Sequence, residues 1–349
     1  MTVQQTFQTQ LAHPTCQYHT AGLDMTCMDC LVISGYASPP AIVVPWSPGP
    51  PAQSLMYPLV TDYTIGPNNM YASHEETYMH KMRFALLEMD RQADFVPNGN
   101  FLDLGCCPGG FATYILSKWP FARGVGVSLP IEYGGHSLAV PLELQDRLEI
   151  YWADVTMLNL APSLLDGYWD TSIFAPCPIP YAAFDFVIVD GHIPPCMTKD
   201  DPRAPWARDR LLLSQLLVAL RAVKPTGTLL TKLSLQVSVP LMERVVLALS
   251  RLSSSPVRAI KPTSIYATAA TFYILVQGLD PARCFHMTRV LEGSWYFMTF
   301  SGPAGFGRRL SDSDMDEIAT YPDVLAASKQ LKSLFAPIEE IQQAARASV

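Results

Sequence analysis

The feature that most constrains this chain is a short apolar stretch that ends in a glycine-rich turn and continues into a helical pattern. Residues 100–104 read Asn-Phe-Leu-Asp-Leu, then come Gly105, Gly109 and Gly110, and residues 111–119 are helical in composition. Glycine permits a sharp turn between a strand and a helix and lets the backbone approach a ligand closely. In open parallel sheets, ligands bind where strands end and helices begin. The turn therefore predicts either a ligand site or a tight turn without a ligand.

The alternation of strand and helix patterns continues along the middle of the chain. We expect further strands at 124–129, 147–152, 184–189, 227–233, 257–261 and 271–276, and helices at 78–93, 206–223 and 241–252. Such alternation predicts an α/β fold, with a mainly parallel sheet and helices on both of its faces. The short connection before the last strand is compatible with antiparallel pairing there.

Composition divides the chain into three zones. Residues 1–76 are rich in Pro and poor in charge, and we interpret them as an irregular N-terminal arm. Residues 77–279 carry the α/β pattern, and residues 280–349 are expected to form a C-terminal helical extension with an amphipathic run at 321–345. The arm and the C-terminal helices are the candidate surfaces for a protein partner or for self-association.

The charge distribution restricts the classes of partner. The formal net charge of −7 argues against a generally basic nucleic-acid binder. The basic residues are unevenly placed, since residues 1–80 contain no Lys or Arg, whereas residues 199–261 hold eleven against four acids. A local basic surface for a nucleic acid is therefore compatible with the acidic total.

Two features of the sequence bear on its compartment. No apolar run approaches the ~18 residues that a membrane helix needs, so we expect no membrane insertion. The sequence opens without the pattern of a secretory signal, and the adjacent Cys106 and Cys107 are typical of reduced thiols. We therefore expect a cytoplasmic protein.

The glycine-rich segment also resembles a known motif. FLDLGCCPGGFATYIL (101–116) is similar to the S-adenosylmethionine motif of the FtsJ-like, ribose 2′-O methyltransferases, in the style of fungal or fungal-virus members. The resemblance continues through FDFVIVDG (184–191) and KPTGTLLTKLS (224–234), and more weakly through 261–278. It implies a Rossmann-like class I methyltransferase domain over residues 77–279. The glycine spacing of NAD-binding turns is absent, which disfavours a dehydrogenase.

The resemblance also implies which residues contact the methyl donor, S-adenosylmethionine. Those in the motif are Asp103, Gly105, Cys106, Cys107, Pro108, Gly109, Gly110 and Phe111, and those that follow other strands are Asp154 and Asp190. Asp154 matches the acid that commonly bonds the adenine amino group in this family, although a helix cap or turn residue is the alternative. Ser128 stands at the end of the second strand, where many relatives carry an acid.

Ribose methylation in this family uses a Lys–Asp–Lys–Glu tetrad, and the resemblance carries over only part of it. Asp190 and Lys232 match the Asp and one Lys, and Lys81 is the candidate for the other Lys. Thr271 occupies the position expected for the Glu, and its hydroxyl can form hydrogen bonds but carries no negative charge. The tetrad is therefore incomplete, and we expect reduced or altered ribose chemistry.

The resemblance implies an S-adenosylmethionine-dependent methyltransferase that acts on an RNA ribose 2′-oxygen, in an RNA cap or a structured RNA. Two alternatives remain open at this point. One is an enzyme of the same fold that methylates a small molecule, which the low basicity and Thr271 favour. The other is a degenerate donor-binding or structural RNA-associated subunit without turnover.

Three further groups of polar residues lie outside the tetrad. Cys27 and Cys30 have the spacing of a zinc knuckle, and Cys16 or His19 could complete a structural zinc site; free thiols in an irregular arm are the alternative. His192, directly after Asp190 and Gly191, is either a substrate contact or proton carrier, or a polar loop residue. Residues 134–136, Gly-Gly-His, either line the donor pocket or form a plain turn.

Overall fold

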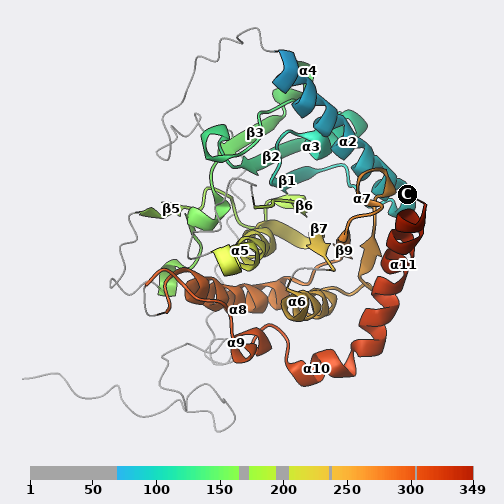
Figure 1. The fold of residues 1–349 in the computed structure, drawn as a ribbon. Helices are drawn as coiled ribbons and strands as arrows, with labels where there is room; N and C mark the ends of the chain where they lie inside the picture. Colours follow the sequence, from blue (N-terminus) through green and yellow to red (C-terminus); the bar gives the residue numbers. More distant parts are fainter. Residues whose placement is uncertain (1–68, 165–172, 194–203, 236–237, 303–304, 349) are drawn as a thin grey trace, which may run out of the picture. The chain divides into compact units, whose positions relative to one another are not determined.

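The computed structural model describes residues 69–164, 173–193, 204–235, 238–302 and 305–348, all of which belong to one unit of the chain (Figure 1). The predicted arm lies outside the described residues except for its last part, since helix α2 (Asn69–Ala93) begins at Asn69 rather than near residue 78. The early start brings Glu75 beside His136, so tertiary contacts accompany the first turns of this helix.

Within the described residues, the main sheet has seven strands in the order β3-β2-β1-β6-β7-β9-β8. The strands are β1 (Asn100–Leu104), β2 (Arg123–Ser128), β3 (Leu148–Trp152), β6 (Phe184–Val189), β7 (Val223–Ser234), β8 (Arg258–Ile260) and β9 (Thr271–Gln277). The first five pair in parallel, while β9 runs antiparallel to both β7 and β8. The prediction of a mainly parallel α/β sheet is confirmed, including the antiparallel pairing of the last strand.

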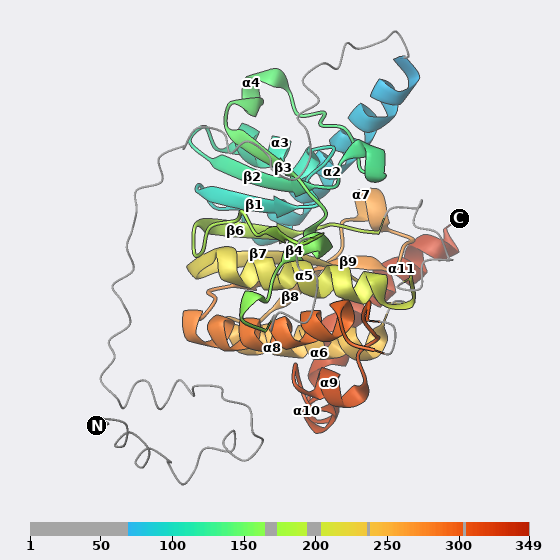
Figure 2. The ribbon, with the colours of Figure 1, turned by 90° about the vertical axis from the view of Figure 1, so that its left-hand side faces the viewer.

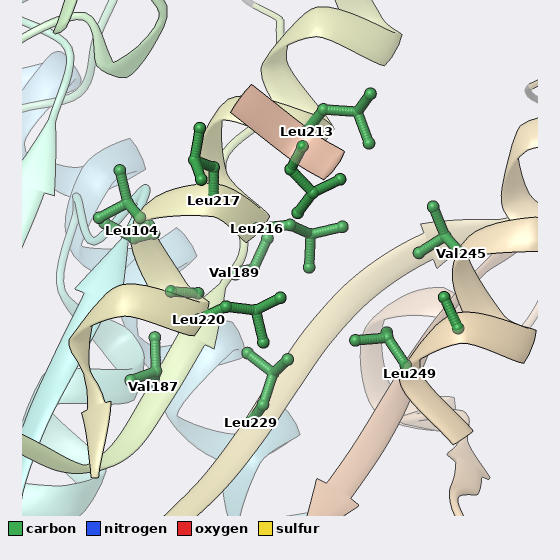
Figure 3. Close-up of a cluster of buried hydrophobic side chains, with 14 of the residues drawn as sticks. Leu104, Val187, Val189, Leu213, Leu216, Leu217, Leu220, Leu229, Val245 and Leu249 are labelled. Atoms are coloured by element: carbon green, nitrogen blue, oxygen red, sulfur yellow. The ribbon is translucent and has the colours of Figure 1, made fainter. Parts of the chain in front are cut away.

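Helices cover both faces of the sheet, because side chains alternate between the faces along each strand. Phe186 and Ile188 join a cluster with α2, α3 (Gly110–Lys118) and α7 (Thr263–Tyr266). Val187 and Val189 face the opposite cluster, with α5 (Ala207–Ala222), α6 (Val239–Leu252) and α8 (Pro281–Thr299). Figure 3 shows leucines of α5 meeting these strand residues. This core fixes the strand ends that carry the polar residues.

Short elements connect the main ones. They are η2 (Ile131–Tyr133), α4 (Leu142–Gln145), η3 (Val155–Met157), η4 (Pro162–Leu164), η6 (Ala204–Trp206), and a small sheet of β4 (Leu158–Asn159) and β5 (Ala175–Pro176). No helix in the described ranges is long and apolar enough to cross a membrane.

The C-terminal part is helical and packs on the core. Beyond α8 it forms α9 (Asp312–Asp316), α10 (Tyr321–Ala326) and α11 (Ser328–Ala347), which Figure 2 shows around α6 and the β8–β9 side of the sheet. Phe335 of α11 meets Phe272 of β9 with ring centroids 5.6 Å apart. Gln342 and Arg346 both donate hydrogen bonds to the carbonyl of Thr268, just before β9. These contacts tie α11 to the segment that leads into β9.

Candidate active site

The glycine-rich turn brings the ends of two strands into direct contact. Gly105 has φ +89°, and a Cβ atom there would lie 2.4 Å from backbone atoms of Gly191, so a side chain is excluded. The amide of Gly105 donates to the carbonyl of Val127 at 2.8 Å, which ties the turn to β2. Asp190, which precedes Gly191, is thereby held beside the turn.

A cavity of about 510 Å³ opens where β1, β2 and β3 end, and this volume is within the range of about 300–1,000 Å³ typical of ligand pockets. Its wall includes the turn (Gly105, Cys107), the end of β2 (Val127, Ser128, Leu129), the segment after β3 (Ala153 to Met157), residues 134–136, His192 and part of α5. Of the predicted donor residues, Gly105, Cys107 and Asp154 therefore border the cavity. Residues 134–136 also line it, as one of their two interpretations required.

The other predicted donor residues surround a narrow pocket next to the cavity. Its wall holds Asp103, Cys106, Pro108, Gly110, Phe111 and Asp190, together with Tyr78, Met82 and His192. The two pockets share Gly105, Cys107 and His192. Gly109 borders neither; it is the residue before α3 and adopts a left-handed conformation with φ +106°. The turn thus supplies one wall common to both spaces.

Asp154 both caps a helix and borders the cavity. Its Oδ1 accepts hydrogen bonds from the amide and the hydroxyl of Thr156, each at 2.8 Å, which caps η3. Both bonds use Oδ1, and Oδ2 has no partner among the described residues, so that oxygen is available to a ligand. The buried Ser128 places a hydroxyl at the end of β2 on the same wall.

Asp103 is the residue of the site whose polar atoms are least satisfied. Its side chain is fully buried, and neither carboxyl oxygen has a hydrogen-bond partner within the described ranges. Burial, and next the negative charge of Asp190, raise the pKa of Asp103 well above its usual value, with Lys232 opposing them. A buried carboxyl without a partner is costly. A ligand that brings positive charge near this carboxyl would offset part of that cost.

The structure brings Asp190 and Lys232 together. Asp190 comes directly after Val189, the last residue of β6, and Lys232 comes directly after Thr231 of β7. Val189 and Thr231 pair across these two neighbouring strands. The Lys232 Nζ atom lies 3.2 Å from Asp190 Oδ1 and also donates to the main-chain carbonyl of Asp190. Both side chains are largely buried, at 14% and 10% exposure, so this ion pair is shielded from solvent.

Tyr273 is a member of this group that the sequence analysis missed. Its hydroxyl donates to Asp190 Oδ1 at 2.6 Å, and its side chain is buried. Lys232 and Tyr273 are directly paired in the antiparallel register of β7 and β9, so their side chains share one face of the sheet. Burial and the charge of Asp190 raise the pKa of Tyr273, which keeps its phenol protonated as a donor.

Thr271 is not brought to the pair. It begins β9, two residues before Tyr273, and pairs with Ser234 at the end of the ladder. Its carbonyl accepts a hydrogen bond from the Lys261 ammonium at 2.9 Å. Thr271 borders neither pocket, and the side chain of β9 that reaches Asp190 is that of Tyr273.

Lys81 also lies away from the pair. It is exposed on α2, whereas the residues of this helix that border the narrow pocket are Tyr78 and Met82. Lys81 itself is not on the wall of that pocket and forms no ion pair with Asp190 among the described residues. The structure therefore offers Asp190 and Lys232 without the second lysine that the resemblance implied.

Two histidines border the cavity, and one of them, His192, also borders the narrow pocket. His136 Nδ1 lies 3.0 Å from Glu75 Oε1, and the His136 ring is 6.2 Å from that of His192. Burial, and next the positive charge of Lys232, lower the pKa of His192, so its ring is neutral at pH 7.

The candidate zinc ligands Cys16, His19, Cys27 and Cys30 lie outside the described residues. Within the described ranges, no group of three or more His, Cys, Asp or Glu side chains is arranged to hold a metal ion. The structure therefore leaves the zinc prediction untested.

Comparisons with known proteins match the α/β part of the chain. A family model described as FtsJ-like methyltransferase matches residues 79–279. A curated relative, the mitochondrial rRNA methyltransferase 2 of Caenorhabditis elegans, is 25% identical over 103 residues, which make up 26% of this chain and 48% of that protein. The match thus spans about half the length of that relative.

Solved structures show looser likeness. A TehB-like S-adenosylmethionine-dependent methyltransferase from Corynebacterium glutamicum is 15% identical, with 59% of this chain and 98% of that one covered and a TM-score of 0.32. The pyocyanin biosynthetic protein PhzM is 17% identical, with coverage of 58% and 55% and a TM-score of 0.32. Superpositions this loose carry no argument about the substrate.

Proposed function

This chain belongs to the FtsJ-like methyltransferase family, whose members depend on S-adenosylmethionine, and from that premise we propose that it methylates a ribose 2′-oxygen of RNA. The observation that carries the proposal is the buried Asp190–Lys232 pair beside the glycine-rich turn and its cavity. A ribose hydroxyl must lose its proton during methyl transfer, and a positioned amine is a suitable acceptor for it.

The residues around the cavity fit the methyl donor. S-adenosylmethionine, when bound, supplies a methyl group on a positively charged sulfonium. The unpartnered carboxyl of Asp103 suits a cationic ligand, and the free Oδ2 of Asp154 can accept a hydrogen bond from an adenine amino group. Gly105 contributes its backbone to the cavity wall, and the hydroxyl of Ser128 on the same wall can form a hydrogen bond with a ribose.

The acceptor side of the site consists of this chain's own proton-handling groups. Asp190 holds the Lys232 amine through its side chain and its carbonyl, and Tyr273 holds Asp190. We assign the deprotonated Lys232 amine, which has first lost its ammonium proton to solvent, the role of taking the hydroxyl proton, and Asp190 the role of orienting that amine. Such positioning of the reacting groups supplies much of the rate enhancement in a transfer reaction.

RNA is the acceptor class that the comparisons support. The named relative is an rRNA methyltransferase, and its similarity to this chain favours a structured RNA over an RNA cap or a small molecule as the first acceptor to test. Localisation in the cytoplasm is part of the proposal, and the buried Cys106 and Cys107, which form no disulfide, suit a reducing compartment. A fungal or fungal-virus origin rests on the style of the motif alone.

The test is transfer of labelled methyl groups from S-adenosylmethionine by the full-length protein to unmodified rRNA transcripts and to capped RNA, followed by nucleoside analysis. Lys232→Met is expected to lower the rate at least about 100-fold, because the proton acceptor is lost. Lys224→Met is a matched control, since Lys224 pairs with Asp185 at 2.8 Å at the other end of the same two strands. Equal rates in the two variants, or a product methylated only on its bases, would overturn the proposal.

A further inference from the structure

Three aromatic side chains form a surface that we call the aromatic ledge: Tyr78, His136 and His192. The Tyr78 and His136 ring centroids are 5.7 Å apart, and those of His136 and His192 are 6.2 Å apart. They come from α2, from the turn after η2, and from the segment after β6. Contact between such distant parts of the chain makes the ledge a product of the tertiary fold.

The ledge adjoins both the donor cavity and the narrow pocket that contains Asp190. His136 and His192 border the cavity, while Tyr78 and His192 border the narrow pocket that contains Asp190. His192 belongs to both walls: its ring packs against them, while part of the residue reaches solvent in the described part of the chain. A ligand placed beside the donor cavity and next to Asp190 therefore lies against these rings.

Neighbouring rings of the ledge are tilted by 38° and 41°, so each ring presents its own face, and two of the three side chains are uncharged. Burial and the negative charge of Asp190 raise the pKa of Tyr78, and burial with the charge of Lys232 lowers that of His192, so both side chains are neutral at pH 7. Glu75 fixes the orientation of the His136 ring through Nδ1. Neutral aromatic faces suit stacking with a nucleobase, whereas phosphates are bound by cationic groups.

We propose that the aromatic ledge stacks the base of the acceptor nucleotide, an inference that rests on the proposed function. An acceptor oxygen at Lys232 belongs to a ribose whose own base is attached beside it, so that base must lie close to the pair. The ledge provides aromatic surface at this place. A base can stack there only after it has left its helix, so the acceptor nucleotide is unpaired or flipped out.

The test measures binding and transfer together. The binding probe is single-stranded RNA that contains 2-aminopurine, whose fluorescence reports stacking, titrated into protein saturated with S-adenosylhomocysteine. Tyr78→Leu and His192→Ala are expected to raise the Kd of this RNA about 5- to 150-fold, as loss of one base–aromatic stack does. His80→Ala is the matched control, because His80 is an exposed histidine of α2 that pairs with Glu76.

Further arms separate stacking from other roles. His192→Phe keeps an aromatic face without a titratable nitrogen, so it is expected to retain most of the affinity and rate that His192→Ala loses. The same RNA annealed to its complement is expected to be a poorer acceptor than the single strand. The ledge proposal fails if Tyr78→Leu and His192→Ala change RNA affinity no more than His80→Ala does. It also fails if His192→Phe loses as much affinity and rate as His192→Ala, or if the duplex is methylated as fast as the single strand.

Failure of the proposed function gives a different result. Wild-type protein that transfers no methyl group to any RNA would remove the premise itself. Wild-type protein that methylates RNA, together with ledge variants that are unaffected, would refute the ledge alone.

Discussion

Asp103→Asn is expected to make the folded protein more stable and its donor binding weaker. Asp103 is fully buried, and neither carboxyl oxygen has a partner in the described part of the chain. Asparagine has nearly the same shape but no charge, so the substitution removes the cost of ionising or protonating a buried carboxyl. The same change removes the negative charge that suits a cationic donor.

The sign follows from the pKa of Asp103, which burial and the charge of Asp190 raise in the folded state. Above the unfolded value of about 3.9, the folded state binds more protons than the unfolded state, so the free energy of unfolding falls as pH rises toward the raised pKa. Each unit of upward shift costs about 1.4 kcal/mol at pH above that pKa. The stability gained through Asp103→Asn should therefore grow as the pH rises from 3.5 to 8 and be almost absent at pH 3.5.

The assay is urea unfolding of wild type and variant across that pH range, with S-adenosylmethionine titrated by calorimetry at pH 8. Loss of a hydrogen bond to a charged group costs about 1.5–3 kcal/mol, so the donor Kd should rise roughly 10- to 100-fold. Asp185→Asn is the control and should lower the free energy of unfolding. Asp185 already has partners, since it pairs with Lys224 and accepts a hydrogen bond from the amide of Asn100. The reasoning would be refuted if Asp103→Asn gave no gain in unfolding free energy at pH 8, or if the gain at pH 3.5 were as large as the gain at pH 8.

Three other substitutions test single contacts. Tyr273→Phe should lower kcat on the order of 10- to 100-fold with donor Kd unchanged, because Asp190 loses its phenol donor. The control is Tyr114→Phe, which removes a 2.6 Å hydrogen bond between Tyr114 and Asp90 and should leave kcat intact in the same methyl-transfer assay. Asp154→Ala should weaken donor binding in calorimetry and lower the unfolding free energy by about 1 kcal/mol through loss of the η3 cap. Lys81→Ala should leave kcat unchanged, because Lys81 is exposed. If Lys81 contacts an RNA phosphate, the slope of log affinity against log salt concentration should become shallower by about one.

The fold could be predicted because its signals are local. The strand at 184–189 is an apolar run ended by Asp-Gly, and the structure has β6 at Phe184–Val189. The antiparallel pairing of the last strand followed from the short connection before it. The start of α2 was predicted nine residues too late, since the charge-poor arm was assumed to extend to residue 76 and the contact between Glu75 and His136 is not visible in the sequence.

The site was predictable where it depends on motifs and less so where it depends on side-chain direction. The exposure of Lys81 has a signal in the sequence, since Met79, Met82, Leu86 and Met89 recur at helical spacing and are the buried face of α2. Tyr273 required the register of β7 with β9, which pairs it with Lys232. Register is set by packing over the whole sheet, so the short motif around Thr271 could not distinguish these neighbouring positions.

The charges of the site also predict how it distinguishes donor from product. Asp103 and Asp190 both lie near Lys232, so two carboxyls share one ammonium in a largely buried place. A cationic donor balances that excess of negative charge, whereas the product, which has lost the positive charge on sulfur, balances it less well. Wild type should therefore bind S-adenosylmethionine more tightly, relative to S-adenosylhomocysteine, than Asp103→Asn does. Paired calorimetric titrations measure both affinities, and an unchanged ratio in the variant would show that Asp103 takes no part in sensing the charge of the donor.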